Sequence, residues 1–331
     1  MTDLKGKKVL VTGAGGFIGI TVVKKLLETE VDRVFAQVKN LRPYYYDDIL
    51  NSPRVTIVES DLTIPDQPSL VLENCKPDYV IVSNAVSFGA KFIQENPLAL
   101  INSNTIMNVN LFSACHEHRV SKIVYYGSTT GYPDLEKNLE EEDMFKDDPF
   151  EKYFSVGWMK RYSEILLRLY SEKLKSMDCT VLRLTNVYGP YDKYDLNTSH
   201  FTPAMIRKFC EGMFPLEVWG TGEDSRDLIY SEDVADITIK SLSLSGFNAI
   251  NVGSGKNYTV NEVIEKLEQA LGVNPEKIYQ EDKPTMISKR SVSLNKLKTL
   301  LGVDSDNLTS LEKGLGITTN WYNNNKSSIY R

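Results

Sequence analysis

Cysteine, histidine and long apolar runs are all scarce in this sequence. Its 331 residues include four cysteines and three histidines, and the cysteines form no C-x-x-C pair. Because the cysteines and histidines are so few and so scattered, neither a disulfide framework nor a zinc site or other metal site is expected. The sequence also has no run of about 18 apolar residues and no apolar stretch typical of an export signal at its start. We therefore expect a cytoplasmic protein that does not enter a membrane.

An excess of positive charge is absent as well. The chain has 38 lysines and arginines against 44 aspartates and glutamates, a formal net charge of −6. A nucleic-acid partner is not expected, because binding of the phosphate backbone depends on clustered basic side chains. With 41% apolar and 25% charged residues, the chain has the composition of an ordinary globular protein and the length to bury a large core.

Short β-branched runs alternate along the chain with stretches of helical periodicity. Such alternation predicts strands linked by crossover helices, and therefore a parallel sheet with helices on both faces. The fold class that we expect is α/β, a Rossmann-type doubly wound parallel sheet with a smaller C-terminal α/β substrate region. The predicted strands are residues 8–12, 34–38, 55–59, 79–83, 123–127 and 180–184.

The rhythm changes after the last of these strands, where turn-rich segments separate shorter elements. We expect one domain over residues 1–180 and a smaller region over residues 181–331, some segments of which can return to the main sheet. The acidic segment 134–148 is expected to be a solvated loop. The tail from Asn320, with its consecutive asparagines, is expected to fray.

A glycine-rich loop follows the first predicted strand and opens the first predicted helix. Gly13, Gly16 and Gly19 stand at G-x-x-G-x-x-G spacing. Glycine lets the backbone turn sharply and approach a pyrophosphate, whose charge then meets the unpaired N–H groups at the start of the helix, here Phe17 and Ile18. The position between strand and helix predicts that this loop binds a dinucleotide.

The end of the second predicted strand normally distinguishes the two nicotinamide dinucleotides. A carboxylate there binds the ribose hydroxyl of NAD, whereas basic side chains accommodate the additional phosphate of NADP. No acid stands at this place, and Lys39 and Arg42 are nearby, so both NAD and NADP remain open. Asp61 and Leu62, after the third predicted strand, are placed either to form a turn or to meet the adenine.

Several further motifs follow one another along the chain. They are Ser83-Asn84-Ala85, the asparagines of N-x-x-x-N-x-N from Asn104, G-S-T-T-G-Y-P at 127–133, N-V-Y-G-P at 186–190, N-T-S-H-x-x-P-A at 197–204 and R-D-L-I-Y-S-E-D-V-A at 226–235. On these motifs the chain resembles, over nearly its whole length, the extended short-chain dehydrogenase/reductase family, in its branch of NAD-dependent nucleotide-sugar epimerases and dehydratases. Within that branch it is most similar to GDP-fucose synthase-like members. The resemblance implies that Ser83, Asn84, Ala85 and Asn104 contact the cofactor.

The resemblance also implies catalytic roles. In the family a serine or threonine bonds the reacting sugar oxygen, a tyrosine moves its proton, and a lysine four residues after the tyrosine holds the nicotinamide ribose. Ser128 and Lys160 match the serine and the lysine, but Val156 stands where the family has its tyrosine. Valine has no ionisable proton, so another group must move the hydroxyl proton during hydride transfer.

Several residues are candidates for that group. His200 matches an active-site histidine of the GDP-fucose synthase-like members and is of a type suited to acid–base work near neutral pH. Tyr132 is a second candidate. Thr130, which stands where those relatives have a cysteine, is counted among the catalytic positions as well. Tyr153 is close in sequence but is expected on a different face. Because no Asp-Glu pair follows Ser128 and no cysteine stands at Thr130, oxidation, reduction or both in succession at sugar C4 are expected rather than elimination or double epimerisation.

The resemblance places a nucleotide sugar beside the C-terminal region. Its diphosphate would meet Asn186, Lys208 and Arg226, and its sugar would meet Ser128 and His200. Residues 1–180 would then bind NAD(P) and residues 181–331 the nucleotide sugar.

The expected function is an NAD(P)-dependent oxidoreductase or 4-epimerase for surface polysaccharide synthesis, with a GDP-sugar preferred. A keto-sugar reductase and a non-catalytic NAD(P)-binding redox sensor or scaffold remain open. By analogy with the family, helices at residues 102–116 and 157–173 would pair in a homodimer.

Overall fold

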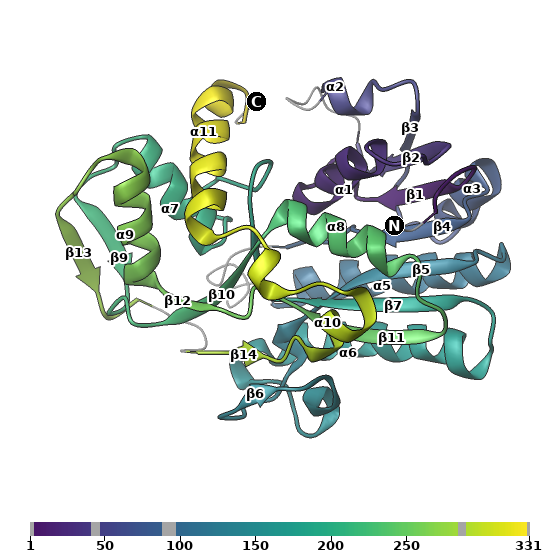
Figure 1. Ribbon diagram of the computed structural model, residues 1–331. Coiled ribbons are helices and arrows are strands. Elements are labelled where there is room, and N and C mark those ends of the chain that lie inside the picture. Colours follow the sequence, from purple (N-terminus) through teal and green to yellow (C-terminus); the bar gives the residue numbers. More distant parts are fainter. Residues whose placement is uncertain (1–2, 41–46, 88–96, 284–288, 330–331) are drawn as a thin grey trace.

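Seven strands form a single parallel sheet in the order β11-β7-β5-β4-β1-β2-β3 (Figure 1). The computed structural model describes residues 3–40, 47–87, 97–283 and 289–329. Each predicted strand is present, and its ends lie within about two residues of the prediction. The strands are β1 (Lys8–Thr12), β2 (Arg33–Val38), β3 (Val55–Glu59), β4 (Tyr79–Val82), β5 (Lys122–Ser128), β7 (Asp178–Leu184) and β11 (Phe247–Val252).

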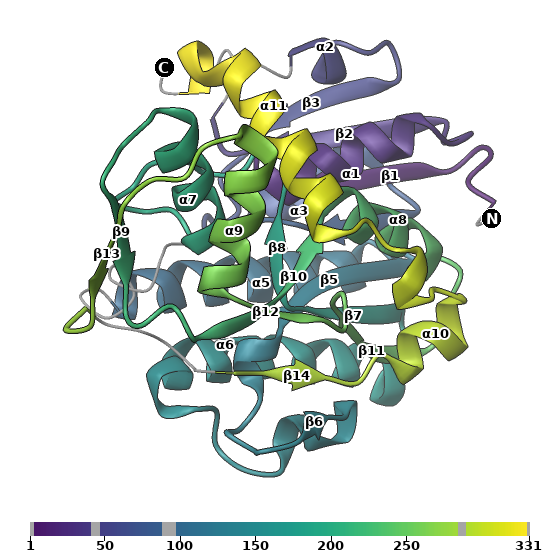
Figure 2. The ribbon, with the colours of Figure 1, turned by 60° about the vertical axis from the view of Figure 1, so that its left-hand side comes forward.

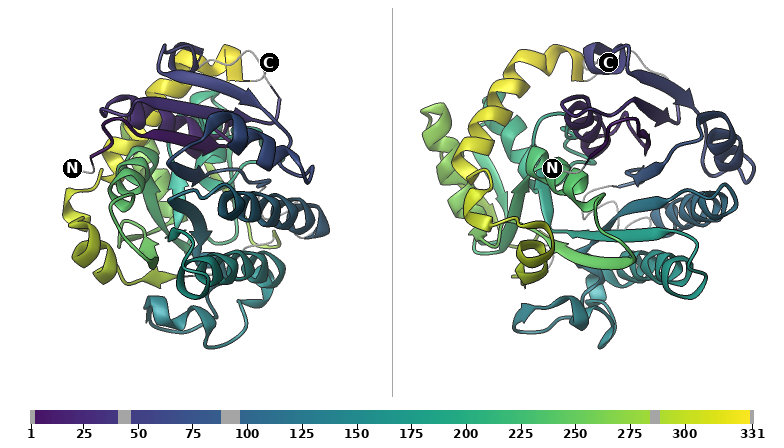
Figure 3. Two further views of the ribbon diagram at one scale, coloured as in Figure 1. Left: turned by 90° about the vertical axis from the view of Figure 1, so that its right-hand side faces the viewer. Right: turned by 45° about the vertical axis from the view of Figure 1, so that its right-hand side comes forward.

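Helices cover both faces of this sheet, which confirms the doubly wound α/β fold (Figure 3). A parallel sheet needs this double cover because its strands are apolar on both faces. No helix in the described part of the chain is both long enough and apolar enough to cross a membrane. One face carries α1 (Phe17–Leu27), α8 (Ser231–Ser241) and α10 (Asn295–Leu301), and the other carries α3 (Gln67–Cys75), α5 (Pro97–Glu117) and α6 (Phe154–Arg168), which a π-helical turn (Leu169–Lys173) continues.

The C-terminal region stands beside the sheet and has an apolar core of its own (Figures 1 and 2). It has a three-stranded sheet in the order β12-β10-β8 and a two-stranded sheet of β13 and β9. Late segments also return to the main sheet, since β11 pairs with β7, and the predicted boundary after residue 180 falls inside β7. The elements of this region are β8 (Asn186–Tyr188), α7 (Phe201–Cys210), β9 (Leu216–Trp219), β10 (Ser225–Tyr230), β12 (Asn257–Thr259), α9 (Val260–Leu271), β13 (Lys277–Gln280) and α11 (Leu311–Ile329).

The acidic segment 134–148 is not the solvated loop that the sequence predicts. It contains β6 (Asn138–Leu139), which pairs with β14 (Ser291–Val292), and a 3₁₀ turn over Glu141–Phe145. Glu141 is 4% exposed and Asp143 is fully buried. Asp143 contacts the ammonium groups of Lys137 and Lys146, each at 2.7 Å, and these bonds hold the pKa of its carboxyl below the usual range. The prediction was wrong because charge alone does not reveal that two carboxylates find partners inside the fold.

The tail is a helix, against the prediction that it frays from Asn320. α11 continues to Ile329, and Tyr322 lies fully buried within it. The hydroxyl of Tyr322 donates to Glu211 Oε1 at 2.6 Å. Leu311, Leu315 and Tyr322 share the core of the C-terminal region, so tertiary packing outweighs the weak helix propensity of the asparagines.

Candidate cofactor and substrate site

The glycine loop between β1 and α1 packs tightly against the loop that follows β4. Gly13 has φ +60°, and a Cβ atom there would lie 2.7 Å from Asn84 Cα. A Cβ atom on Gly19 would lie 2.3 Å from the carbonyl oxygen of Gly13. Gly16 is the N-cap of α1, so the helix opens at Phe17 without a side chain over its first N–H groups. Gly13, Gly16, Phe17, Ile18 and Gly19 all lie in this tight turn, and a turn of this shape at the start of a helix is suited to a pyrophosphate.

Gln37, which sequence reasoning missed, holds the glycine loop in place. The Gly13 N–H donates to Gln37 Oε1 at 3.0 Å, and Gln37 Nε2 donates to the Ser60 carbonyl at 2.7 Å. Gln37 is 2% exposed, and a buried amide must have such partners. The feature of the sequence that could have revealed this role is a glutamine inside an otherwise mostly apolar strand.

Lys39 and Asp61 meet at the ends of β2 and β3. Their side chains form an ion pair with Nζ and Oδ2 2.9 Å apart. Hydrogen bonds from Thr63 and Lys39 lower the pKa of Asp61 to about 2, so the carboxylate stays charged at neutral pH. Leu62 is buried in the core, and Arg42 lies outside the described residues. Asp61 thus both shapes a turn, through Thr63, and carries a charge beside Lys39.

The loop after β4 is tied to β1 and to α5. Thr12 Oγ1 donates to Asn84 Oδ1 at 2.6 Å and accepts the Ser83 N–H at 3.2 Å. Asn104 Oδ1 accepts the Val86 N–H at 2.8 Å, and its Nδ2 donates to the Val86 carbonyl at 2.9 Å. Asn104 therefore positions this loop through its backbone, and Ala85 lies exposed between the two attachments.

Ser128, Thr130, Val156 and Lys160 come together where β5 ends and α6 begins. Ser128 Oγ accepts hydrogen bonds from Thr130 N–H at 3.1 Å and Thr130 Oγ1 at 2.9 Å. Lys160 Nζ donates to the Tyr126 carbonyl at 2.8 Å. Val156 lies one turn before Lys160 on the same side of α6, because residues four apart share a helix face. The predicted serine and lysine thus both lie near the end of β5, and the residue one turn before the lysine is aliphatic.

Tyr132 does not belong to this assembly, which corrects its candidacy for proton transfer. It is fully buried. Its hydroxyl donates to Asn251 Oδ1 at 2.6 Å and accepts from Arg183 Nη1 at 2.8 Å. Burial raises the pKa of Tyr132 far above its usual value. The ring is a structural support behind the loop that carries Ser128.

Two arginines donate hydrogen bonds to backbone carbonyls of the loop that follows Ser128, and sequence reasoning missed both. Arg161 Nε, on α6, donates to the Gly131 carbonyl at 2.7 Å. Arg290, just before β14, donates to the Thr129 carbonyl and, at 3.3 Å, to the Tyr132 carbonyl. The loop after Ser128 thus takes its shape from side chains on both sides.

His200 lies at the N-cap of α7 and reaches the loop after β4. Its Nε2 is 3.2 Å from Ser87 Oγ, while Lys193 Nζ donates to the Ser87 carbonyl at 2.8 Å. The imidazole remains accessible to solvent, yet the protein around it disfavours the charged form and, with the nearby charge of Lys193, lowers the pKa of His200. His200 is therefore mainly neutral at physiological pH and is attached to the loop that follows β4.

The three predicted diphosphate ligands divide into two places. Asn186 opens β8 opposite Leu228 of the neighbouring strand β10, two residues beyond Arg226. Asn186 Nδ2 donates to the Asp227 carbonyl at 3.2 Å, and Arg226 Nη1 to the Ser225 carbonyl at 2.8 Å. Lys208 instead donates to the Glu217 carbonyl on β9 at 2.9 Å. The structure brings Asn186 and Arg226 onto neighbouring strands and gives Lys208 a partner at another sheet.

Asp192 supplies a prediction of pH dependence. It is 7% exposed, and burial raises the pKa of its carboxyl to about 7 although the Lys193 N–H donates to it. A raised carboxyl pKa means that the folded state binds the extra proton, so the wild type loses stability as the pH rises from about 4 to 7. Asp192→Asn keeps the acceptor without the charge. We expect it to be more stable than the wild type above pH 7, by on the order of 1 kcal/mol or more, and equal to it near pH 4, in urea titrations.

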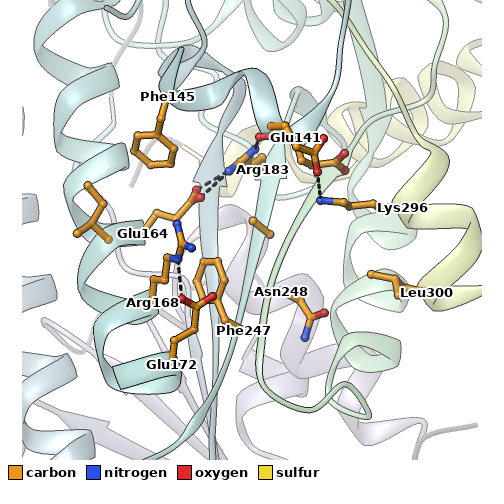
Figure 4. A pocket seen from close by; sticks show the side chains of 13 residues that line it. Glu141, Phe145, Glu164, Arg168, Glu172, Arg183, Phe247, Asn248, Lys296 and Leu300 are labelled. Atoms are coloured by element: carbon orange, nitrogen blue, oxygen red, sulfur yellow. Dashed lines mark hydrogen bonds and ion pairs between the residues drawn. The ribbon is translucent and has the colours of Figure 1, made fainter. Parts of the chain in front are cut away.

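A cavity of about 570 Å³ opens elsewhere, between α6 and α10 at the edge of β11 (Figure 4). Charged pairs line it: Arg183 with Glu164, Arg168 with Glu172, and Lys296 with Glu142. None of the predicted cofactor or catalytic residues faces it. The glycine loop and Ser128 lie instead at the carboxyl ends of β1 and β5, where ligands bind in open parallel sheets.

Comparison with known proteins identifies the family of this chain. The model of the NAD dependent epimerase/dehydratase family matches residues 9–253. GDP-L-colitose synthase from Yersinia pseudotuberculosis is 27% identical over 97% of this chain and 99% of that protein. UDP-glucuronate 4-epimerase from Thermodesulfobacterium geofontis is 28% identical over 96% of each chain. UDP-glucose 4-epimerase from Thermotoga maritima, 23% identical, shares the fold with a TM-score of 0.85 over 96% of this chain and 99% of that chain. The chain belongs to the NAD dependent epimerase/dehydratase family.

Proposed function

We propose that this protein is an NAD(P)-dependent oxidoreductase or 4-epimerase acting at C4 of a nucleotide-activated sugar. The observation that carries the proposal is the assembly of Ser128 and Lys160 at the carboxyl end of the same sheet that bears the glycine loop. Ser128 orients the sugar hydroxyl, and Lys160 holds the ribose of the cofactor. When bound, the nicotinamide accepts or returns the hydride.

The nucleotide moiety is proposed to lie against the C-terminal region. Asn186 and Arg226, on neighbouring strands β8 and β10, would meet its diphosphate, and His200 would face the sugar. A GDP-sugar is preferred, because GDP-L-colitose synthase and a GDP-L-fucose synthase from Sinorhizobium fredii, the latter 27% identical over 94% of each chain, are among the relatives. Synthesis of a surface polysaccharide is the process that we propose for such a sugar.

Absorbance of the nicotinamide tests the proposal directly. Wild-type protein is mixed with NAD or NADP, oxidised or reduced, and a panel of GDP-, UDP- and dTDP-sugars. We expect a redox change with at least one sugar, and expect Ser128→Ala to remove it while the affinity for the cofactor stays within about twofold. A complete panel without any redox change or sugar conversion would falsify the enzymatic function.

Val156 favours one rival function, a cofactor-binding redox sensor or scaffold without catalysis. An aliphatic residue at this place removes the usual proton donor. If the protein is such a sensor, we expect tight binding of NAD(P) and no conversion of any sugar. If it is a keto-sugar reductase, we expect it to consume one reduced cofactor for each sugar converted. The ratio of cofactor consumed to product formed distinguishes these functions.

We further propose that NADP binds more tightly than NAD. Lys39 directly follows β2, and its side chain is 66% exposed and paired with Asp61. Its ammonium group is therefore in a position to meet the additional phosphate of NADP. Lys39→Glu is expected to weaken NADP binding about tenfold or more relative to NAD, by reversing the charge at that place. Fluorescence titration with both cofactors measures the ratio, and an unchanged ratio contradicts the preference.

A homodimer in the cytoplasm is also proposed. Apolar side chains of α5 and α6 are exposed together, among them Ile106, Val109, Trp158, Tyr162 and Ile165, each at least 38% accessible, as expected of a surface that another chain covers. Sedimentation should give twice the chain mass, and Trp158→Lys should shift it toward the monomer. The four free cysteines fit the reducing cytoplasm.

A further inference from the structure

One guanidinium joins the loop that carries Ser128 to a tyrosine at the start of α6. Arg290 donates hydrogen bonds to the carbonyls of Thr129, Tyr132 and Pro133, the last two at 3.3 and 3.5 Å. Its Cζ atom lies 5.7 Å from the ring centre of Tyr153. Arg290 therefore contacts both the Tyr153 ring and the backbone of Thr129, the residue that directly follows Ser128.

Tyr153 also directly precedes the helix that carries the positions that matter for proton transfer. A 3₁₀ turn over Glu151–Tyr153 runs directly into α6, and Tyr153, at φ −108° and ψ 7°, is its N-cap. Val156 follows three residues later and Lys160 seven residues later, spacings that return to one side of a helix. Because the turn and the helix are continuous, Tyr153 stands about one turn before Val156.

Arg290 also interacts electrostatically with Tyr153. The titratable and charged groups that face Arg290 are Tyr153, Asp134 and Tyr132. Burial lowers the pKa of the Arg290 guanidinium, but an arginine starts so high that it keeps its charge at every physiological pH. A fixed positive charge close to a phenolic oxygen stabilises a phenolate relative to a phenol. Tyr132, by contrast, is fully buried and bonded to Asn251 and Arg183.

We infer that Tyr153, supported by Arg290, is the proton-transferring residue of this active site, in the place of the group that Val156 cannot supply. The inference rests on the proposed function. In the reducing direction the carbonyl carbon of the sugar receives a hydride from reduced nicotinamide. The carbonyl oxygen takes the proton of the Tyr153 hydroxyl, and the phenolate left behind regains a proton from water. In the oxidising direction the phenolate would take the proton of the sugar hydroxyl while the hydride from the same carbon would pass to oxidised nicotinamide.

Substitution at two positions tests the inference. Tyr153→Phe is expected to lower kcat about 100-fold or more, the size of a lost general acid or base, with little change in cofactor affinity. Adding Val156→Tyr to Tyr153→Phe is expected to restore at least tenfold of that loss, since the new phenol lies about one turn further along the chain. Tyr279→Phe, an exposed tyrosine on β13, is the control and should match the wild type. Wild-type kcat in Tyr153→Phe overturns the inference and leaves the proposed function intact.

A second measurement needs neither sugar nor turnover. Ultraviolet difference titration of the wild type against Tyr153→Phe isolates the ionisation of this one phenol. Arg290→Gln is expected to move that ionisation to higher pH, at least tenfold in proton concentration. Arg161→Gln, which loosens the neighbouring Gly131 carbonyl, is the control and should leave it in place. If Arg290→Gln and Arg161→Gln titrate alike, Arg290 does not support Tyr153 and the inference fails, whether or not the wild type converts a sugar.

Discussion

Gly13→Ala should weaken NAD(P) binding by about 100-fold. The new Cβ atom would stand 2.7 Å from Asn84 Cα and 2.9 Å from the Ser83 carbonyl oxygen, both backbone atoms that no side-chain rotation can move. Overpacking of this kind costs about 1–3 kcal/mol, and a positive φ adds about 1–2 kcal/mol for a residue with a Cβ. Each 1.4 kcal/mol that falls on the bound state is about tenfold in affinity. Fluorescence titration with both cofactors measures the effect.

Gly6→Ala separates the clash from the backbone strain. Gly6 has φ +71°, close to that of Gly13, yet nothing lies within 4 Å of a Cβ atom placed there. We expect Gly6→Ala to lose about 1 kcal/mol of stability and to keep its affinity for the cofactor. Equal affinities of the two variants would show that the approach of the glycine loop to residues 83–84 does not shape the cofactor site.

Glu164→Gln should lower the free energy of unfolding by about 3–5 kcal/mol. Glu164 and Arg183 form an ion pair with side chains 5% and 3% exposed. Burial alone would lower the pKa of Arg183, but its hydrogen bonds with Glu164 raise it instead. The substitution leaves the guanidinium charged and buried without its carboxylate. Urea unfolding at neutral pH, followed by circular dichroism, should show the midpoint fall.

Glu172→Gln is the matched control, two turns further along the helix at the same cavity (Figure 4). Glu172 pairs with Arg168 at 2.8 Å, but those side chains are 37% and 60% exposed. Water screens such a pair, so its loss should cost less than about 1 kcal/mol. A midpoint shift as large as that of Glu164→Gln would mean that burial does not govern the strength of these pairs.

Local patterns in the sequence were sufficient for the elements that position the cofactor. Residues 8–12 and 55–59 are strands with the predicted bounds, and α1 begins at Phe17, directly after the glycine loop. Such features follow from short-range constraints: β-branched runs favour strands, and glycine alone relieves crowding in a turn against a helix. Gln37 escaped prediction because a buried amide is recognised only by its partners, here the Gly13 N–H and the Ser60 carbonyl.

The sequence by itself determined the alternating architecture, the glycine loop between β1 and α1, and the presence of Ser128 and Lys160 without their tyrosine. Only the tertiary structure decided which side chains surround them. Tyr132 has a supporting role because its hydroxyl bonds Asn251 and Arg183. Arg290, which is distant in the sequence, contacts both Tyr153 and the loop after Ser128. Periodicity and spacing report on neighbours a few residues apart, whereas burial and hydrogen bonding depend on contacts that the folded chain makes between distant segments.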